Sequence, residues 1–168
     1  MTHRLPRLLA AIALTALTAA ACSITGINGN KKISELDADE RVQACENTRE
    51  YYEKKISEDD AKHVGCVTAG VLAASFGGGD VSICTGAYDE CMAKPVEENE
   101  QDACEPGDDS TCDATISDYE DCLEEQVEEY KDLIDRYTCA TGLDGSVSIE
   151  QEAGPACKAF YEQCPGGL

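Results

Sequence analysis

Eleven cysteines in 168 residues constrain this chain more than any other feature. An exported chain normally pairs its thiols as disulfides, whereas a cytosolic chain keeps them for metal or redox chemistry. Because eleven is an odd number, one cysteine must have another fate. Setting Cys22 aside leaves ten cysteines, enough for five disulfides: Cys45, Cys66, Cys84, Cys91, Cys104, Cys112, Cys122, Cys139, Cys157 and Cys164.

Large apolar side chains are scarce in the same chain. From Cys22 onward, Leu, Ile, Val and Phe together supply 24 of 147 residues, too few for a highly charged chain to fold on hydrophobic burial alone. Five disulfides at typically 2 to 4 kcal/mol each would contribute on the order of 10 kcal/mol. The cysteines therefore predict a fold that depends on covalent crosslinks.

The amino-terminal segment has the layout of an export signal. Arg4 and Arg7 precede an uncharged run of 11 residues, 8–18, which is shorter than the roughly 20 apolar residues that a spanning helix requires. Ala19 and Ala21 then supply the small side chains of an A-x-A cleavage site directly before Cys22. We therefore expect residues 1–21 to be a signal peptide that is removed.

Residues 17–22, with the sequence LTAAAC, resemble the lipobox of bacterial lipoproteins. The resemblance implies that Cys22 becomes a lipidated, palmitate-carrying amino terminus. It also implies that Ser23, in place of Asp, directs the protein to the outer membrane of a two-membrane bacterium. Ala19 stands where the family usually has Leu, which leaves ordinary secretion with a free or paired Cys22 as the alternative. The rest of the chain is similar to small cysteine-rich lipoproteins only in general style.

Helical periodicity dominates the chain after the signal. Residues 22–33 contain Gly and Asn without apolar periodicity and are expected to form a flexible, lipidated tether, and residues 34–168 the folded domain. Caps and apolar spacing predict helices over residues 34–55, 57–76, 81–94 and 115–137, and a short one from Pro155. We predict an all-α, disulfide-rich domain of about five helices, with an acidic loop over residues 96–113.

Helix geometry limits how the cysteines pair. Cys84 and Cys91 would lie about 10 Å apart on one helix, and the longer Cys122 to Cys139 separation would be about 25 Å; both exceed the roughly 7 Å limit for a disulfide. If the first two helices form an antiparallel hairpin, Cys45 and Cys66 come level with each other. We therefore expect a Cys45–Cys66 disulfide and leave the other pairings open.

Charge and motif content exclude several functions. The net charge is −21, and it becomes −23 when Arg4 and Arg7 leave with the signal. Nucleic acid is therefore an unsuitable partner. No C-x-x-C occurs, so neither a zinc site nor a thioredoxin-type redox site is expected. His63 is the single histidine after residue 21. It lies beside Lys62, with Asp59 and Asp60 one helical turn earlier, and a surface ion pair explains it without catalysis.

A calcium site is the remaining metal alternative. Residues 144–150 resemble half of an EF-hand loop, but Ala140, Gly142 and Gln151 occupy the positions of key ligands, so we interpret them as a turn. Residues 95–130 contain 15 acids and no Lys or Arg, which predicts a solvated acidic face or a loose divalent-cation site.

Together these observations predict an exported, membrane-anchored envelope lipoprotein. We expect a non-enzymatic binding or structural module with no cofactor and no catalytic residue, whose acidic surface contacts a cationic protein or peptide. The alternatives are a calcium-binding envelope protein and a secreted enzyme that uses His63.

Overall fold

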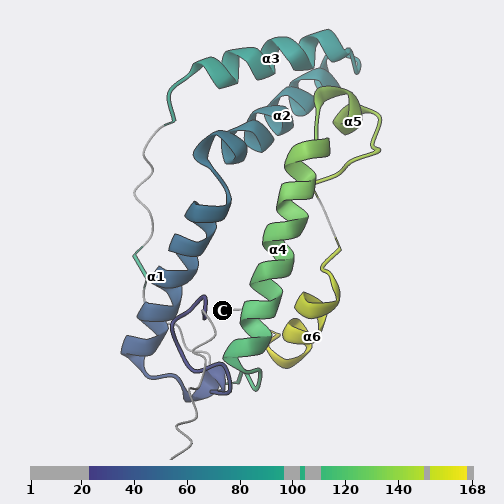
Figure 1. The fold of residues 1–168 in the computed structure, drawn as a ribbon. Helices are drawn as coiled ribbons and strands as arrows, with labels where there is room; N and C mark the ends of the chain where they lie inside the picture. Colours follow the sequence, from purple (N-terminus) through teal and green to yellow (C-terminus); the bar gives the residue numbers. More distant parts are fainter. Residues whose placement is uncertain (1–22, 97–102, 105–110, 150–151, 166–168) are drawn as a thin grey trace, which may run out of the picture.

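The computed structural model describes residues 23–96, 103–104, 111–149 and 152–165. Within these ranges the chain is helical and has no strand, which confirms the predicted all-α class (Figure 1). The elements are a short 3-10 helix η1 (Ile33–Glu35) and the α-helices α1 (Ala38–Lys55), α2 (Glu58–Phe76), α3 (Val81–Ala93), α4 (Ile116–Arg136), α5 (Cys139–Leu143) and α6 (Pro155–Gln163). None of the helices in these ranges is long and apolar enough to cross a bilayer.

The helices form two long limbs. In Figure 1, α1 and α2 follow one another along one limb, and α4 runs in the same direction along the other. Helix α3 folds back on α2, and α6 packs against α4. The α2–α3 turn needs glycine, because Gly78 and Gly79 have φ angles of 87° and 83°, in the left-handed region that other residues avoid.

Local capping signals account for most helix starts. Ser57 with Asp60 and Thr115 with Asp118 form reciprocal capping boxes at α2 and α4, which confirms both predicted starts. The predicted start of the first helix at Ser34 is wrong. The Ile33 and Ser34 amides instead donate to the carbonyl groups of Ala114 and Cys112, so the backbone becomes α-helical only at Ala38.

The predicted flexible tether is also wrong for the part that the structure describes, residues 23–33. Thr25 and Ile33 are completely buried, and Ile27 is nearly so. The Asn47 side chain donates to the Thr25 carbonyl at 2.6 Å, which holds the segment against α1. This segment is therefore part of the folded domain, and the domain begins earlier than residue 34.

The core is divided between the two ends of the limbs. At one end, apolar residues of η1, the start of α4 and α6 surround Phe160, which is 2% exposed. At the other end, Val64 and Val67 of α2 pack against Leu133 and Tyr137. Neither cluster alone is large, which agrees with the scarcity of apolar residues. The middle of the two limbs lies between the clusters.

Disulfides join these elements, and the ten cysteines of the domain form five pairs. The pairs are Cys45–Cys104, Cys66–Cys91, Cys84–Cys139, Cys112–Cys164 and Cys122–Cys157. The two excluded intrahelical pairs are indeed absent from this set. The expected Cys45–Cys66 pair is wrong, because α1 and α2 form one bent limb and not a hairpin (Figure 1). The hairpin is α2–α3, and Cys66–Cys91 crosslinks it.

The predicted set of helices does not include α5. This short helix contains Gly142, and the Thr138 side chain caps its start. In α3, Ile83 is 40% exposed near the α2–α3 turn.

Candidate functional site

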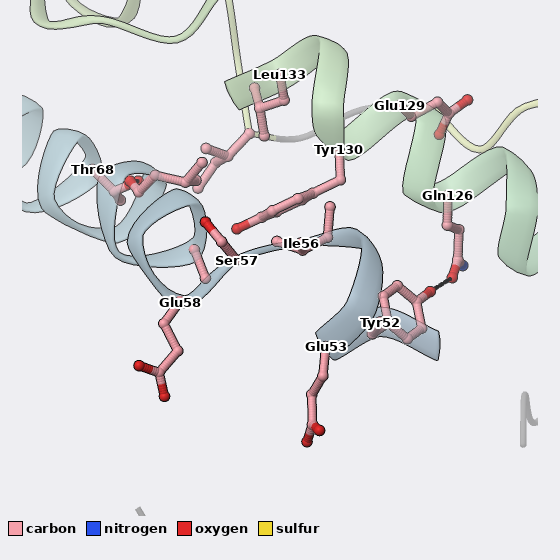
Figure 2. Close-up of a pocket in the computed structure, with 13 residues that line it drawn as sticks. Tyr52, Glu53, Ile56, Ser57, Glu58, Thr68, Gln126, Glu129, Tyr130 and Leu133 are labelled. Carbon is pink, nitrogen blue, oxygen red and sulfur yellow. Dashed lines mark hydrogen bonds between the residues drawn. The ribbon is translucent and has the colours of Figure 1, made fainter. Parts of the chain in front are cut away.

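A groove lies between the two limbs, at the junction of α1 with α2 and beside the middle of α4. We call it the α1–α4 groove; its volume is about 710 Å³. It is lined by Tyr52, Glu53, Ile56, Ser57, Glu58, Ala61, Val64, Thr68, Gln126, Glu129, Tyr130, Leu133 and Ile149. Figure 2 shows the Tyr130 ring reaching from α4 toward Ile56 and Ser57 at the junction.

The break between α1 and α2 creates this groove. Ile56 (φ −120°, ψ 117°) and Ser57 (φ −74°, ψ 157°) both have an extended backbone, so the helical direction changes over these two residues, and Ser57 caps α2. Helix α4 runs past this junction without a break. The two core clusters lie toward the ends of the limbs, and the groove lies between them at the junction.

A hydrogen-bonded chain closes one end of the groove. The Tyr52 hydroxyl donates to Gln126 Oε1 at 2.6 Å, and Gln126 Nε2 donates to the Tyr161 hydroxyl at 3.0 Å (Figure 2 shows the first bond). One glutamine of α4 therefore joins α1 to α6. Burial, and to a smaller extent the neighbouring tyrosines, raises the pKa of Tyr52 to about 12, so this hydroxyl stays a donor at physiological pH.

The interior of the groove is apolar and its edges are acidic. Val64 and Leu133 are 8% and 4% exposed and form part of the floor. The lining includes three glutamates and no Lys, Arg or His. In Figure 2, Glu53 and Glu58 extend from one edge and Glu129 from the other. Burial, and then the negative charge of Asp60, raise the pKa of Tyr130, so its phenol also stays neutral.

His63 lies outside this groove and joins helices. Its Nδ1 is 3.0 Å from the Tyr88 hydroxyl of α3, and its Nε2 is 3.0 Å from the Tyr137 carbonyl at the end of α4. Nε2–H therefore donates to the carbonyl, and Nδ1 accepts from the phenol. The expected surface ion pair is wrong, and both ring nitrogens have structural partners.

The other candidate sites are only partly described. Cys22 lies outside the described residues, as does most of the acidic loop between residues 96 and 113. Among the residues that the structure covers, no three His, Cys, Asp or Glu side chains are grouped closely enough to bind a metal ion. Asp144 Oδ1 accepts from the Ser146 amide at 2.8 Å, a bonding pattern typical of a turn.

Local sequence patterns do not predict the α1–α4 groove. Ile56 and Ile149 lie at breaks in the helical structure, and no local pattern specifies the direction that the chain takes there. No protein-family model, curated protein or solved structure matches this chain. The groove and the disulfide framework are thus the basis for a functional conclusion.

Proposed function

We propose that this protein is exported, anchored to a membrane through a lipid on Cys22, and acts there as a non-enzymatic module that binds a cationic partner. The observation that carries the binding proposal is the α1–α4 groove, with its apolar interior and acidic edges. Ser23 after the anchor favours the outer membrane as the location in a bacterium with two membranes.

The disulfides support the export part of the proposal. Five disulfides fit an exported protein, because thiols in the cytosol are kept reduced. These ten cysteines pair with one another, and Cys22 is the remaining one of the eleven. Lipidation of Cys22 would account for the odd number, and residues 17–22 supply the sequence that directs it.

The amino-terminal contacts determine how an anchored domain would sit. Ser23 is bonded to Glu120 near the start of α4, so the folded domain begins one residue after the proposed lipid attachment. With no flexible linker, this end of the limbs would lie at the bilayer. The α2–α3 turn lies toward the opposite end (Figure 1) and would project away from the membrane.

The chemistry of His63 supports a non-enzymatic module. A general base needs a ring nitrogen that can take a proton from substrate, and both nitrogens of His63 are engaged by Tyr88 and Tyr137. A cationic partner is supported by the net charge of −21 and by the edges of the groove.

The anchor is tested by replacing the proposed lipid-bearing residue. Cys22→Ser should release the protein from membranes into the soluble exported fraction and abolish its labelling by radioactive palmitate. Thr18→Ser, a change within the same signal, should alter neither result. Palmitate labelling that persists in Cys22→Ser would contradict the anchor.

The binding proposal is tested with peptides of opposite charge. A lysine-rich peptide should bind the full exported domain in isothermal titration calorimetry, and its affinity should fall as salt screens the charges. A glutamate-rich peptide of equal length should not bind. Binding of the lysine-rich peptide that is absent, or insensitive to salt, would refute a cationic partner.

A further inference from the structure

The α1–α4 groove has an apolar interior and acidic edges, and this arrangement indicates the kind of ligand that would fit. Side-chain carbon from Ile56, Val64 and Leu133 lines the interior. The carboxylates lie at the edges (Figure 2), where Glu53 and Glu58 are exposed and Glu129 is half-buried. A molecule complementary to this arrangement has an apolar body for the interior and a positive charge at one end.

The size of the groove matches a small organic molecule. Sites that bind such molecules commonly have volumes of about 300 to 1,000 Å³, mostly apolar walls and a few polar groups. At about 710 Å³ the groove lies within this range. Burial of an alkyl or aromatic body there would contribute about 25 cal/mol for each Å² of apolar surface removed from water.

The charges select a cation over an anion. An anionic group would face Glu58 and Glu129, and the lining contains no Lys, Arg or His; the third glutamate, Glu53, lies 4.0 Å from Arg49 Nε. An ammonium group is attracted to the same carboxylates and also to aromatic faces. The chain already contains one such contact between an ammonium group and an aromatic ring. On α1, Lys55 Nζ lies 5.4 Å from the centre of the ring of Tyr51, the residue before Tyr52.

We propose that the α1–α4 groove binds a small organic ammonium ion whose apolar body lies along Tyr130 and Ile56 and whose charge lies at the glutamate edges. This inference rests on the proposed function, because it names the ligand class for the same acidic module. It commits to a free amine and not to a peptide.

Three small molecules test separately how the apolar body and the positive charge of the ligand contribute to binding. Octylammonium, below its micelle concentration, should shift the NMR signals of Tyr130, Ile56 and Ile149 with a saturable dose response. Octanoate has the same chain with the opposite charge, and methylammonium has the charge without the chain, so both should bind far more weakly. Equal binding of octanoate would overturn the proposal.

Matched charge variants then locate the site. Glu58→Gln with Glu129→Gln should weaken octylammonium binding by about fivefold, as expected for the loss of two solvent-exposed ion pairs. The control is Asp59→Asn with Glu128→Gln, which removes the same charge from neighbouring positions outside the groove lining. Its affinity should change less than twofold. Equal weakening in both variants would show a diffuse charge effect and overturn the groove as the site.

Ile149→Ser tests the apolar wall. Ile149 is 49% exposed, so the change should leave the thermal melting temperature nearly unaltered while it weakens octylammonium binding. Unchanged affinity in this variant would count against the apolar contact.

The lysine-rich peptide distinguishes this inference from the broader function. Salt-sensitive peptide binding without octylammonium binding would overturn the amine site and leave the cationic partner intact. If neither probe bound, both proposals would fail.

Discussion

Glu120 illustrates how one side chain can determine where the folded domain begins. Its Oε1 accepts from the Ser23 hydroxyl at 2.6 Å, from the Thr25 amide at 2.8 Å and from the Thr25 hydroxyl at 2.7 Å. Thr25 is completely buried, so its polar groups cannot easily be solvated instead. A segment with a linker-like sequence is therefore held in the core by a distant carboxylate.

Glu120→Ala should consequently lower the free energy of unfolding by about 2 kcal/mol, because buried donors lose a charged acceptor. Urea denaturation of the disulfide-intact protein measures this change. The control is Asp121→Ala, an exposed acid at the next position of α4, which should change stability by less than about 0.5 kcal/mol. Equal stability of the Glu120 variant and the wild type would mean that the segment is not held by this carboxylate.

Tyr52 links stability to alkaline pH. Its folded pKa is raised from 10.0 to about 12, chiefly by burial, so the folded state holds the proton more tightly than the unfolded state. The resulting contribution is complete below pH 10 and is lost as the pH rises toward 12. The urea midpoint should fall over this window, and it should fall less steeply in Tyr52→Phe. Identical pH profiles for both proteins would contradict the raised pKa.

At the scale of elements, α4 organises its neighbours through side chains on several faces. Glu125 accepts from the Cys157 amide at 2.9 Å and from the Ala156 amide at 3.3 Å, so α4 caps the start of α6. Gly154 precedes α6 and has no capping side chain of its own, and a Cβ there would collide with the Glu125 carboxyl group. Pro155 at the first position needs no amide partner.

Glu125→Ala should therefore loosen α6 and lower the free energy of unfolding by about 1 kcal/mol, the usual value of a helix cap. Hydrogen exchange should accelerate at the Ala156 and Cys157 amides while exchange within α2 stays the same. Glu124→Ala, an exposed neighbour, supplies the control. Uniform acceleration across all helices would indicate global destabilisation in place of a lost cap.

At the scale of the whole molecule, the disulfides compensate for a small and divided core. Cys45 is exposed, whereas both cysteines of the Cys112–Cys164 and Cys122–Cys157 pairs are no more than 3% exposed. A mild reductant should therefore open Cys45–Cys104 before these two pairs, since reduction requires access to a sulfur atom. Stepwise alkylation followed by peptide mass mapping would determine the order.

Full reduction should unfold the domain. Each disulfide typically contributes about 2 to 4 kcal/mol, and the sum is comparable to the whole stability of a domain. Circular dichroism should lose most of its helical signal after complete reduction, whereas alkylation without reductant should leave it unchanged. An unaltered spectrum after reduction would refute the dependence on crosslinks.

Features that depend on neighbouring residues could be predicted from the sequence, whereas features that depend on distant contacts could not. The capping boxes at Ser57 and Thr115 and the proline at the start of α6 depend on contacts within a few residues, and all three starts were predicted correctly. The predicted start of α1 was wrong because the amides of Ile33 and Ser34 donate hydrogen bonds to residues 114 and 112, about eighty positions away. Local patterns contain no information about such partners.

By itself, then, the sequence determined that this protein is helical and that it needs crosslinks, because helical periodicity, capping and the scarcity of large apolar residues are all written in local order and composition. Only the tertiary structure decided which cysteines pair, where the domain begins and where a ligand could bind. The physical reason is the direction of the chain at Ile56 and Ser57. These two extended residues make α1 and α2 a bent limb and not a hairpin, which separates Cys45 from Cys66 and opens the α1–α4 groove.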